Sequence, residues 1–407
     1  MPTYVYEAVN DEGRTVRGIL EAKTRIQALE ALKQYRYQIK KIQEQTKLLL
    51  FLHKLQKVNQ DSIAIFTRQF AAMIKAGLPI MRCLDLLSRK GDNLRLEDVI
   101  LLVREHVKAG NSLSQALARY PDVFNPVYLE LIKAGELSGD MGDILERMAN
   151  YLEKDAFIRK RLRSALTYPI VVFSFCVLIA FLLVIYIFPK FISLFRGFHV
   201  PTPLPTQILM FTVNLAKNPF FILIIIGILG VLAFLLSQYL RTAVGRRHYH
   251  QWLLFMPIFG DLNKKVAASR FCRTLSTLIA AGVPLMQSLD IVGRVTGNEV
   301  LNEAVDQARQ AVKYGSTISA PLEESKIFPS LAVSMLQVGE QTGELPKMLK
   351  KVADFYDAEI ELTLIRFTKL LEPILIAAMG LIVGFVVISI FLPIYSLIGH
   401  FSMNGGG

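Results

Sequence analysis

The residues of this chain that could do chemistry are few, and they form no catalytic pattern. Of the six histidines, only His248 and His250 lie close together, in the segment RRHYH. Two imidazoles can hold a metal ion, but this pair stands beside a long apolar segment, where anchoring at a membrane surface is the better interpretation. The sequence contains no GxxxxGKS/T loop, no HExxH, no CxxC and no GxSxG. We therefore expect no catalytic residue, no metal site and no cofactor, and a protein that is not an enzyme.

The most specific local signal is a glycine-bounded motif that occurs twice, as GELSG at 135–139 and GEQTG at 339–343. Its glycines permit a tight passage between two helices, and its hydroxyl residue could cap the helix that follows. The glycines are Gly135, Gly139, Gly339 and Gly343, and the hydroxyl residues are Ser138 and Thr342. Glu136 and Glu340 leave two alternatives open. Their carboxylates either accept backbone N–H groups at the helix junction or make a coupling contact with a partner or a cation.

These motifs belong to a long internal repeat that covers residues 61–189 and 266–393. The segment AGLPIMRCLDLL at 76–87 returns as AGVPLMQSLDIV at 281–292, an offset of 205, and the offset becomes 204 further on. Solenoid repeats run to about 50 residues, so a repeat of this length indicates a duplicated domain. Each copy carries the same helix-ending glycine and helix-starting proline, Gly77 with Pro79 and Gly282 with Pro284.

Apolar residues recur every three and four positions in both copies, which predicts about six short-looped amphipathic helices in each. We expect all-α bundles at 61–168 and 266–372. Asp61 is expected to cap the first helix. Later helices are expected to begin at Asn111-Ser112 and Ser316-Thr317, then at Phe124-Asn125-Pro126 and Phe328-Pro329.

Apolar residues make up 52% of the chain and the mean hydropathy is +0.39, yet Lys, Arg, Asp and Glu total 46 + 34 = 80. Such a chain has parts in a membrane and parts in water. Residues 170–188 carry no charge and, at about 1.5 Å per residue, would span roughly 28 Å as a helix. We expect three transmembrane helices, at 169–189, 220–240 and 373–398.

Basic residues cluster before the first span, after the second and before the third, which predicts that these ends are cytoplasmic. The N-terminus is then cytoplasmic and the tail at 399–407 periplasmic, with a periplasmic loop at 190–219 and a cytoplasmic linker at 241–265. This topology accounts for the net charge of +12 without nucleic acid. No cleaved signal peptide is expected, and the three cysteines are expected to be free thiols.

Residues 1–46 differ from the rest, because alternating strand-like segments and one short helical segment predict a small ββαβ module. A basic linker at 47–60 follows it. The fold class expected for the whole chain is mostly α, a polytopic membrane protein with two homologous cytoplasmic bundles.

The spans contain no internal charged residue or histidine, which argues against a transporter or channel. Pro169, Glu372 and Pro373 lie at the cytoplasmic mouths of the first and third spans. Gly380 and Gly384 form a GxxxG pattern in the third, which leaves two alternatives open: dimerisation through that face, or packing within the chain.

The chain carries the AGLP and AGVP turns with the upstream FTRQF and FCRTL, the two glycine-bounded motifs, and YP and EP before two of the spans. In these motifs it resembles the PilC/GspF family of inner-membrane platform proteins. The resemblance covers nearly the whole chain and favours the type IV pilus branch. It implies a platform that couples a cytoplasmic hexameric ATPase to the insertion of pilin subunits into a filament base. It also implies other inner-membrane pilus components as partners, and a bacterial inner membrane location. Whether the platform binds an assembly ATPase, a retraction ATPase or both stays open. A second copy of the chain is also expected as a partner, in a homodimer.

Two alternatives remain beside this reading. The first is the equivalent platform of a type II secretion system, which belongs to the same family. The second is of a different class, a membrane-bound docking or signalling receptor whose helical bundles bind soluble partners. In the platform reading, residues 156–168 and 360–372 are the helices that connect the bundles to the membrane.

Overall fold

The computed structural model describes residues 3–9, 15–21, 27, 29, 38–44, 58–88, 93–190, 203–256 and 259–404. Near the N-terminus it has three antiparallel strands, β1 (Thr3–Val9), β2 (Thr15–Glu21) and β3 (Gln38–Glu44), in the order β2-β1-β3. Gln27 and Leu29 are helical. The rest of the helix predicted between the second and third strands lies outside the described residues, as does most of the predicted linker at 47–60.

The first repeat forms short helices that end at glycine or begin at a capping residue. They are α3 (Gln60–Lys75), α4 (Ile80–Leu87), α5 (Leu94–Lys108), α6 (Leu113–Ala118), α7 (Pro126–Ser138) and the start of α8 (Met141–Leu182). Asn93, Ser112 and Asn125 cap α5, α6 and α7 with their side-chain oxygens. The expectation that Asp61 caps the first helix is wrong. Asn59 is the cap, and it accepts the N–H of Asp61.

The second repeat gives the same series of helices. They are α13 (Phe259–Ala280), α14 (Leu285–Val295), α15 (Glu299–Lys313), α16 (Ser319–Glu324), α17 (Ser330–Thr342) and the start of α18 (Leu345–Asn404). The helix expected to begin at Ser316-Thr317 begins instead at Ser319, and no side chain at its own N-cap accepts a hydrogen bond. Its orphan N–H groups are satisfied from elsewhere in the bundle, as described below.

Contacts group the chain into two compact units that do not follow the repeat boundary. Unit 1 comprises residues 1–156 and 274–295, and unit 2 comprises 157–273 and 296–407. The helix α14 therefore belongs with the first repeat's helices, where it packs against α7. Each unit has its own buried apolar core, with Phe70, Phe124 and Leu145 in unit 1 and Phe271, Leu336 and Leu349 in unit 2.

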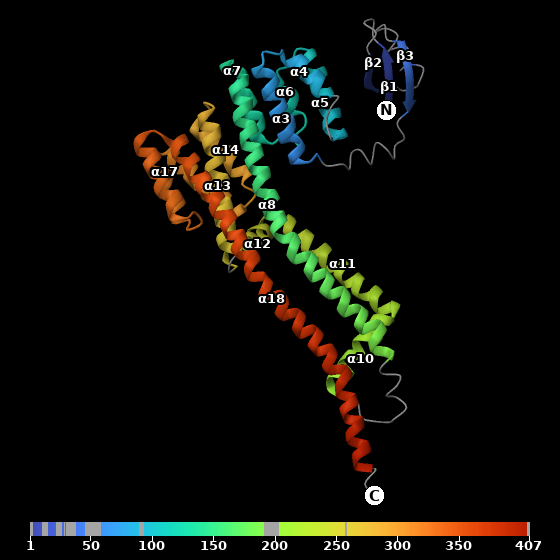
Figure 1. Cartoon of the computed structure of the whole chain (residues 1–407). Helices are drawn as coiled ribbons and strands as arrows, with labels where there is room; N and C mark the ends of the chain where they lie inside the picture. Colours follow the sequence, from blue (N-terminus) through green and yellow to red (C-terminus); the bar gives the residue numbers. More distant parts are fainter. Residues whose placement is uncertain are drawn as a thin grey trace. The chain divides into compact units, whose positions relative to one another are not determined.

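Three helices in the described part of the chain are long and apolar enough to cross a membrane. The first runs from Met141 to Lys190 and includes the π-helix η1 (Leu183–Ile187), the second is α11 (Pro219–Arg241), and the third is the Leu345–Pro393 part of α18. Figure 1 shows α18 as one continuous rod coloured orange to red. Two of the three helices thus begin in a bundle and continue without a break into an apolar segment.

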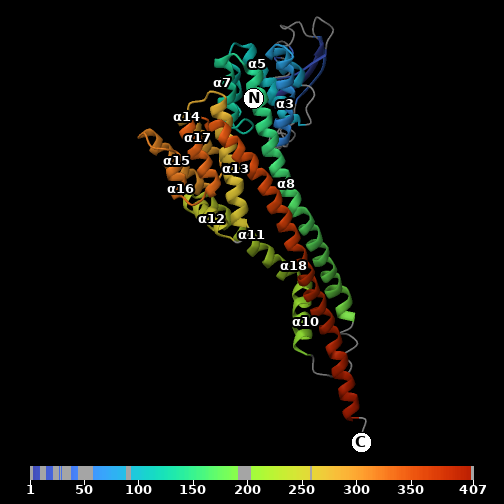
Figure 2. The same ribbon diagram turned by 60° about the vertical axis from the view of Figure 1, so that its left-hand side comes forward.

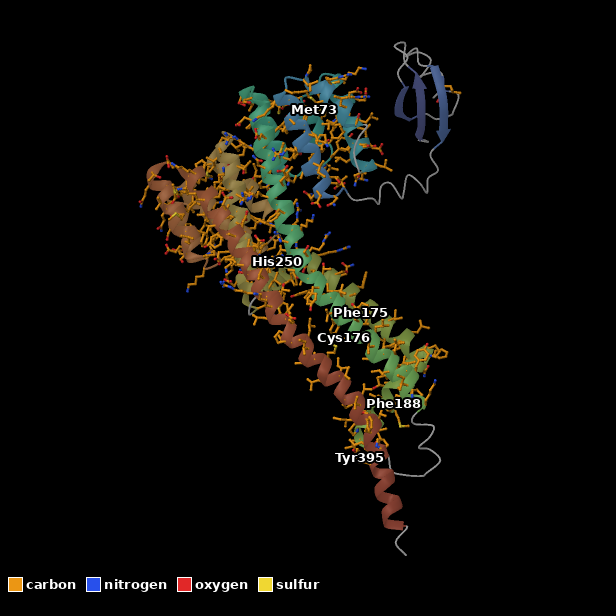
Figure 3. The ribbon with its side chains drawn as sticks, viewed as in Figure 1. Met73, Phe175, Cys176, Phe188, His250 and Tyr395 are labelled. Atoms are coloured by element: carbon orange, nitrogen blue, oxygen red, sulfur yellow. The ribbon has the colours of Figure 1, made fainter. Side chains whose placement is uncertain are left out.

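The predicted outer loop contains a helix, α10 (Leu204–Lys217), which packs against α18. The sequence left two alternatives open for residues 207–216, a segment resting at the membrane interface or a plain connecting loop, and the helix rules out the plain loop. Leu209 and Val213 of α10 form a buried cluster with Phe188 and Val386. Figure 3 labels Phe188 in this region.

A buried hydrogen bond also ties α10 to α18. Pro393 lies inside α18 and has no N–H, so the carbonyl of Ser389, four residues earlier, loses its helical donor. The hydroxyl of Thr206 donates to that carbonyl at 2.8 Å. Because both residues are buried, Thr206 supplies the one hydrogen bond that the proline removed.

The predicted linker after the second span contains a further helix, α12 (Ala243–Phe255). His250 accepts the backbone N–H of Glu299 at 3.1 Å, at the first residue of α15. Arg246 and Arg247 form ion pairs with Glu299 and Glu303, at 3.5 and 3.1 Å. Burial lowers the pKa of His250, which favours the neutral imidazole needed to accept this bond. The histidine thus fastens α12 to the second repeat.

Candidate functional site

The two glycine-bounded motifs lie at the end of equivalent helices, α7 and α17. Gly139 and Gly343 end these helices with φ of 77° and 72°, in the left-handed region. Non-glycine residues lose roughly 1–2 kcal/mol there, which explains the glycine at this position of both repeats. Gly77 and Gly282 likewise have positive φ, and Pro79 and Pro284 immediately precede α4 and α14.

The first glycine of each motif does not form the tight passage between helices that the sequence predicted. Gly135 and Gly339 are buried inside α7 and α17. A Cβ at Gly135 would lie 3.1 Å from Met141 Sδ, and one at Gly339 would lie 3.1 Å from the Cα of Leu345. These glycines therefore let the next helix begin in direct contact with the one that has just ended.

Glu136 and Glu340 hold the N-terminus of another helix in their own repeat. Glu136 accepts the N–H of Ser114 at 3.1 Å and the Ser114 hydroxyl at 2.5 Å, at the start of α6. Glu340 accepts the Ser319 hydroxyl at 2.6 Å and the N–H groups of Ile318 and Ser319 at the start of α16. Each carboxylate thus accepts backbone N–H groups, but from a helix about 22 residues earlier rather than from its own junction.

The hydroxyl residues of the motif do not cap the helix that follows. Asp140 caps α8, because its Oδ1 accepts the N–H of Asp143 at 3.0 Å, while Ser138 accepts only the N–H of Asp140. Thr342 donates its hydroxyl back to the carbonyl of Val338. The predicted capping role of Ser138 and Thr342 is therefore wrong. In the first repeat the carboxylate of Asp140, one residue after Gly139, is better placed to accept the N–H group.

A second repeated contact joins the first and last helices of each bundle. Arg68 on α3 donates to Glu153 at 2.6 Å and to Asn150 at 2.5 Å, both on α8. The hydrogen bond from the Arg68 guanidinium lowers the pKa of Glu153. In the second repeat, Arg273 on α13 pairs in the same way with Asp357 and Asp354 on α18.

This clamp was not predicted from the sequence, although part of its signal is visible there. The arginines match at the offset of 205, and Asn150 and Glu153 match Asp354 and Asp357 at the offset of 204. What was missed is that residues about 80 positions apart pair in both copies. The second clamp is the more buried, with side chains of Arg273 and Asp357 only 12% and 13% exposed.

The two helical segments that lead toward the membrane pack together in unit 2. Ile158 of α8 and Ile360 and Leu364 of α18 form one buried cluster with Leu262 of α13. Polar contacts surround this cluster. Arg161 pairs with Glu361 at 3.0 Å, and Lys265 pairs with Asp261 and Glu359 at 2.9 and 3.2 Å. We call this set the connector cluster, and Figure 2 shows α13 running beside α18 where it lies.

The remaining predicted residues lie apart from the two motif glutamates. Pro169 and Pro373 lie inside α8 and α18, and Glu372 is exposed. A Cβ built at Gly380 or Gly384 would meet no heavy atom within 4 Å, so the described residues do not pack against this GxxxG face. The alternative of packing within the chain is therefore not seen there, and dimerisation through that face stays a prediction. A closer approach between spans is at Cys176, whose Sγ lies 3.3 Å from Met379 Sδ.

The chain also matches proteins of known name. The family model described as type II secretion system (T2SS), protein F, matches residues 66–189 and again 271–393, and the model of that protein's N-terminal domain matches residues 1–43. The double match confirms the duplicated domain.

Full-length relatives carry both branch names. The type IV pilus assembly protein PilC of Myxococcus xanthus is 36% identical over 399 residues, covering 97% of this chain and 95% of the relative. PilC of Thermus thermophilus is 35% identical and covers 99% and 100%. Type II secretion system protein F of Xanthomonas campestris is 31% identical and covers 98% and 99%. With matches on both repeats and on the N-terminal module, the chain belongs to the type II secretion system protein F family, which is the family expected from its sequence motifs.

Proposed function

We propose that this protein is the inner-membrane platform of a type IV pilus assembly machine. The observation that carries the proposal is the full-length similarity to proteins named for pilus assembly, at 35–36% identity. The architecture supports it, because two helical bundles connect to long apolar helices that lack internal charges. The platform is non-enzymatic, and its task is mechanical coupling.

The proposed topology has three spans, with the N-terminus in the cytoplasm and the C-terminus in the periplasm. Support comes from the basic residues beside the apolar helices, at 159–163, 241–247 and 366–369. Both bundles then lie in the cytoplasm, and α10 lies on the periplasmic side. The N-terminal strands, with an intervening helix, form the ββαβ module on the cytoplasmic side.

The proposed partners follow from this placement. A hexameric ATPase binds the cytoplasmic bundles, and pilin subunits and other inner-membrane components meet the spans. The platform itself is a homodimer. The motif glutamates act indirectly, because Glu136 and Glu340 fix α6 and α16, and these helices shape the surface that a cytoplasmic partner meets.

The connector cluster is the proposed point of force transfer. Its helices carry both repeats toward the membrane, and their buried contacts join α8, α13 and α18. A rigid-body movement of a bundle relative to the spans would therefore shift one connecting helix against the other at this cluster.

Crosslinking the connectors tests this transfer. We expect that joining cysteines at Arg161 and Glu361, whose side chains meet at 3.0 Å, with a short bismaleimide stops filament assembly without unfolding the protein. Each single-cysteine chain treated in the same way is the control. Normal piliation at complete crosslinking would rule out movement between the connectors.

Deleting the gene tests the function as a whole. We expect that surface filaments disappear by electron microscopy while pilin accumulates in the inner membrane, and that the full chain restores them. The relative from Xanthomonas campestris favours type II secretion as a second candidate. Normal pili with exoproteins trapped in the periplasm would establish that candidate instead, and no change in either would contradict the platform function.

A further inference from the structure

The second repeat exposes an apolar face on α17 and α18. Leu331, Val338 and Phe355 are 37%, 38% and 47% exposed. We call these three residues the forward face. They lie in a bundle rather than in an apolar span, so lipid does not account for their exposure in the proposed topology.

The same positions are covered in the first repeat. At the offset of 204, the counterparts are Val127, which is fully buried, and Ala134 and Tyr151, which are half-buried. In unit 1, helix α14 packs on α7 here, and Tyr151 accepts a hydrogen bond from the hydroxyl of Thr274 at 3.3 Å. Another bond runs from Gln287 on α14 to Glu130 on α7 at 2.7 Å.

The covering residues belong to the second repeat, and their counterparts in the first repeat are exposed to solvent. Thr274 is 4% exposed, and Thr277 and Gln287 are half-buried. Their counterparts at the offset of 205, Gln69, Ala72 and Arg82, are all exposed. Ile65 is 52% exposed and lies on the same stripe of α3 as Gln69 and Ala72, at spacings of four and three residues. We call Ile65, Gln69, Ala72 and Arg82 the reverse face.

Among the described residues there is therefore one forward-to-reverse contact, and one face of each kind is left uncovered. We propose that the forward face of one copy docks on the reverse face of a second copy, reproducing between chains the contact that α7 and α8 make with α13 and α14 in unit 1. The repeated sequence supplies the fit, because the unused faces descend from surfaces that already pack together. Such a contact is head-to-tail, so it continues from copy to copy until a ring closes.

This inference rests on the proposed function, which includes a homodimer, and adds which two surfaces of the copies meet. The contact differs from dimerisation through Gly380 and Gly384, which would be a contact between spans. The two surfaces match in chemistry. The three apolar side chains of the forward face meet Ile65, Ala72 and the amide of Gln69, and Arg82 lies at the edge of the contact. In this arrangement Ser334 and Arg82 take the places of Glu130 and Gln287.

The test uses two differently tagged full-length chains expressed together in membranes. One carries Arg82→Cys and the other carries Ser334→Cys, and a short bismaleimide joins cysteines that lie close. We expect a crosslink between the two chains, and no crosslink when both carry Arg82→Cys or both carry Ser334→Cys. A chain with Lys313→Cys, at an exposed position of α15, replaces the Ser334→Cys chain as the control. Of the three native cysteines, Cys83 and Cys272 are buried, and Cys176 lies in the apolar part of α8, outside both faces, so a chain with neither added cysteine gives the background.

A single substitution placed in either chain gives the decisive comparison. Phe355→Asp in the chain with Ser334→Cys is expected to reduce the crosslink about tenfold, since that chain presents its forward face. The same substitution in the chain with Arg82→Cys should leave the crosslink unchanged, because there only the reverse face is used. Unfolding caused by the substitution would instead reduce both.

Three results would overturn the proposal: a crosslink between like chains, no crosslink between unlike chains, or equal loss in both placements of Phe355→Asp. Ile65→Asp should give the mirror result, with loss only in the chain with Arg82→Cys. The crosslink is scored without reference to filaments, so a failure of the pilus function in the deletion strain remains distinguishable from a failure of this contact.

Discussion

Replacing Glu340 with leucine is expected to destabilise the second bundle by about 3 kcal/mol, because hydrogen bonds to a charged group are lost and buried donors remain. The carboxylate accepts the N–H groups of Ile318 and Ser319, which are only 1% and 2% exposed. The helix α16 has no capping side chain of its own, so no other group replaces Glu340. Hydrogen exchange of the purified full-length protein in detergent should show lost protection at these two amides.

The first repeat provides the matched control for this prediction. Glu136→Leu removes the equivalent carboxylate, but α6 keeps its own capping box between Ser112 and Gln115. We therefore expect a smaller loss of protection in α6 than in α16. The amide variant Glu340→Gln, which keeps one acceptor oxygen, should fall between wild type and Glu340→Leu. Unchanged protection at Ile318 and Ser319 in Glu340→Leu would show that this carboxylate does not act as a helix cap.

Thr206→Val is expected to weaken the contact between α10 and α18 by about 2 kcal/mol, since it leaves a buried carbonyl without a donor. The substitution keeps the size of the side chain but removes the hydroxyl that bonds to Ser389 at 2.8 Å. The measurement is labelling of Val213→Cys, a position of α10 that is 5% exposed, by a membrane-impermeant maleimide. Labelling should become more than about tenfold faster in the Thr206→Val background, given that 1.4 kcal/mol is tenfold in an equilibrium.

Thr212→Val is the control for this second prediction. Thr212 lies on the same helix, but its hydroxyl donates at 2.9 Å to the carbonyl of Ile208 within α10 itself. That carbonyl has its ordinary helical partner, so the labelling rate of Val213→Cys should stay near that of the parent. If both valine substitutions accelerate labelling equally, the bond to Ser389 does not hold α10 in place.

Comparison of individual elements shows which features the sequence could predict. The duplication could be predicted because both copies keep the same helix-ending glycine and helix-starting proline, Gly77 with Pro79 and Gly282 with Pro284. The three long apolar helices followed from length and hydropathy, which are local properties. The helix starts at Ser112 and Asn125 were also correct, since a side-chain cap is set by neighbours within three residues.

Two of the differences between sequence and structure have a common physical cause: a residue far away in the chain supplies the interaction that was missed. The start of α16 was placed too early because its cap is Glu340, some 21 residues later. A plain loop stayed open as an alternative for the outer segment, because the buried contacts with α18 and the bond from Thr206 that hold α10 are made with residues far away in the chain. Contacts of this kind produce no repeating pattern or fixed spacing in the amino-acid sequence, so the sequence does not predict them.

By itself, the sequence determined that this protein is a duplicated helical domain joined to apolar helices, because periodicity, punctuation and hydropathy act over one helix at a time. Only the tertiary structure decided which groups complete one another: Glu136 with α6, Arg273 with Asp357, and α14 with the helices of the first repeat. The physical reason is that each of these contacts satisfies a buried donor, a charge or an apolar face between segments far apart in the chain, and their pairing is fixed only when the helices pack.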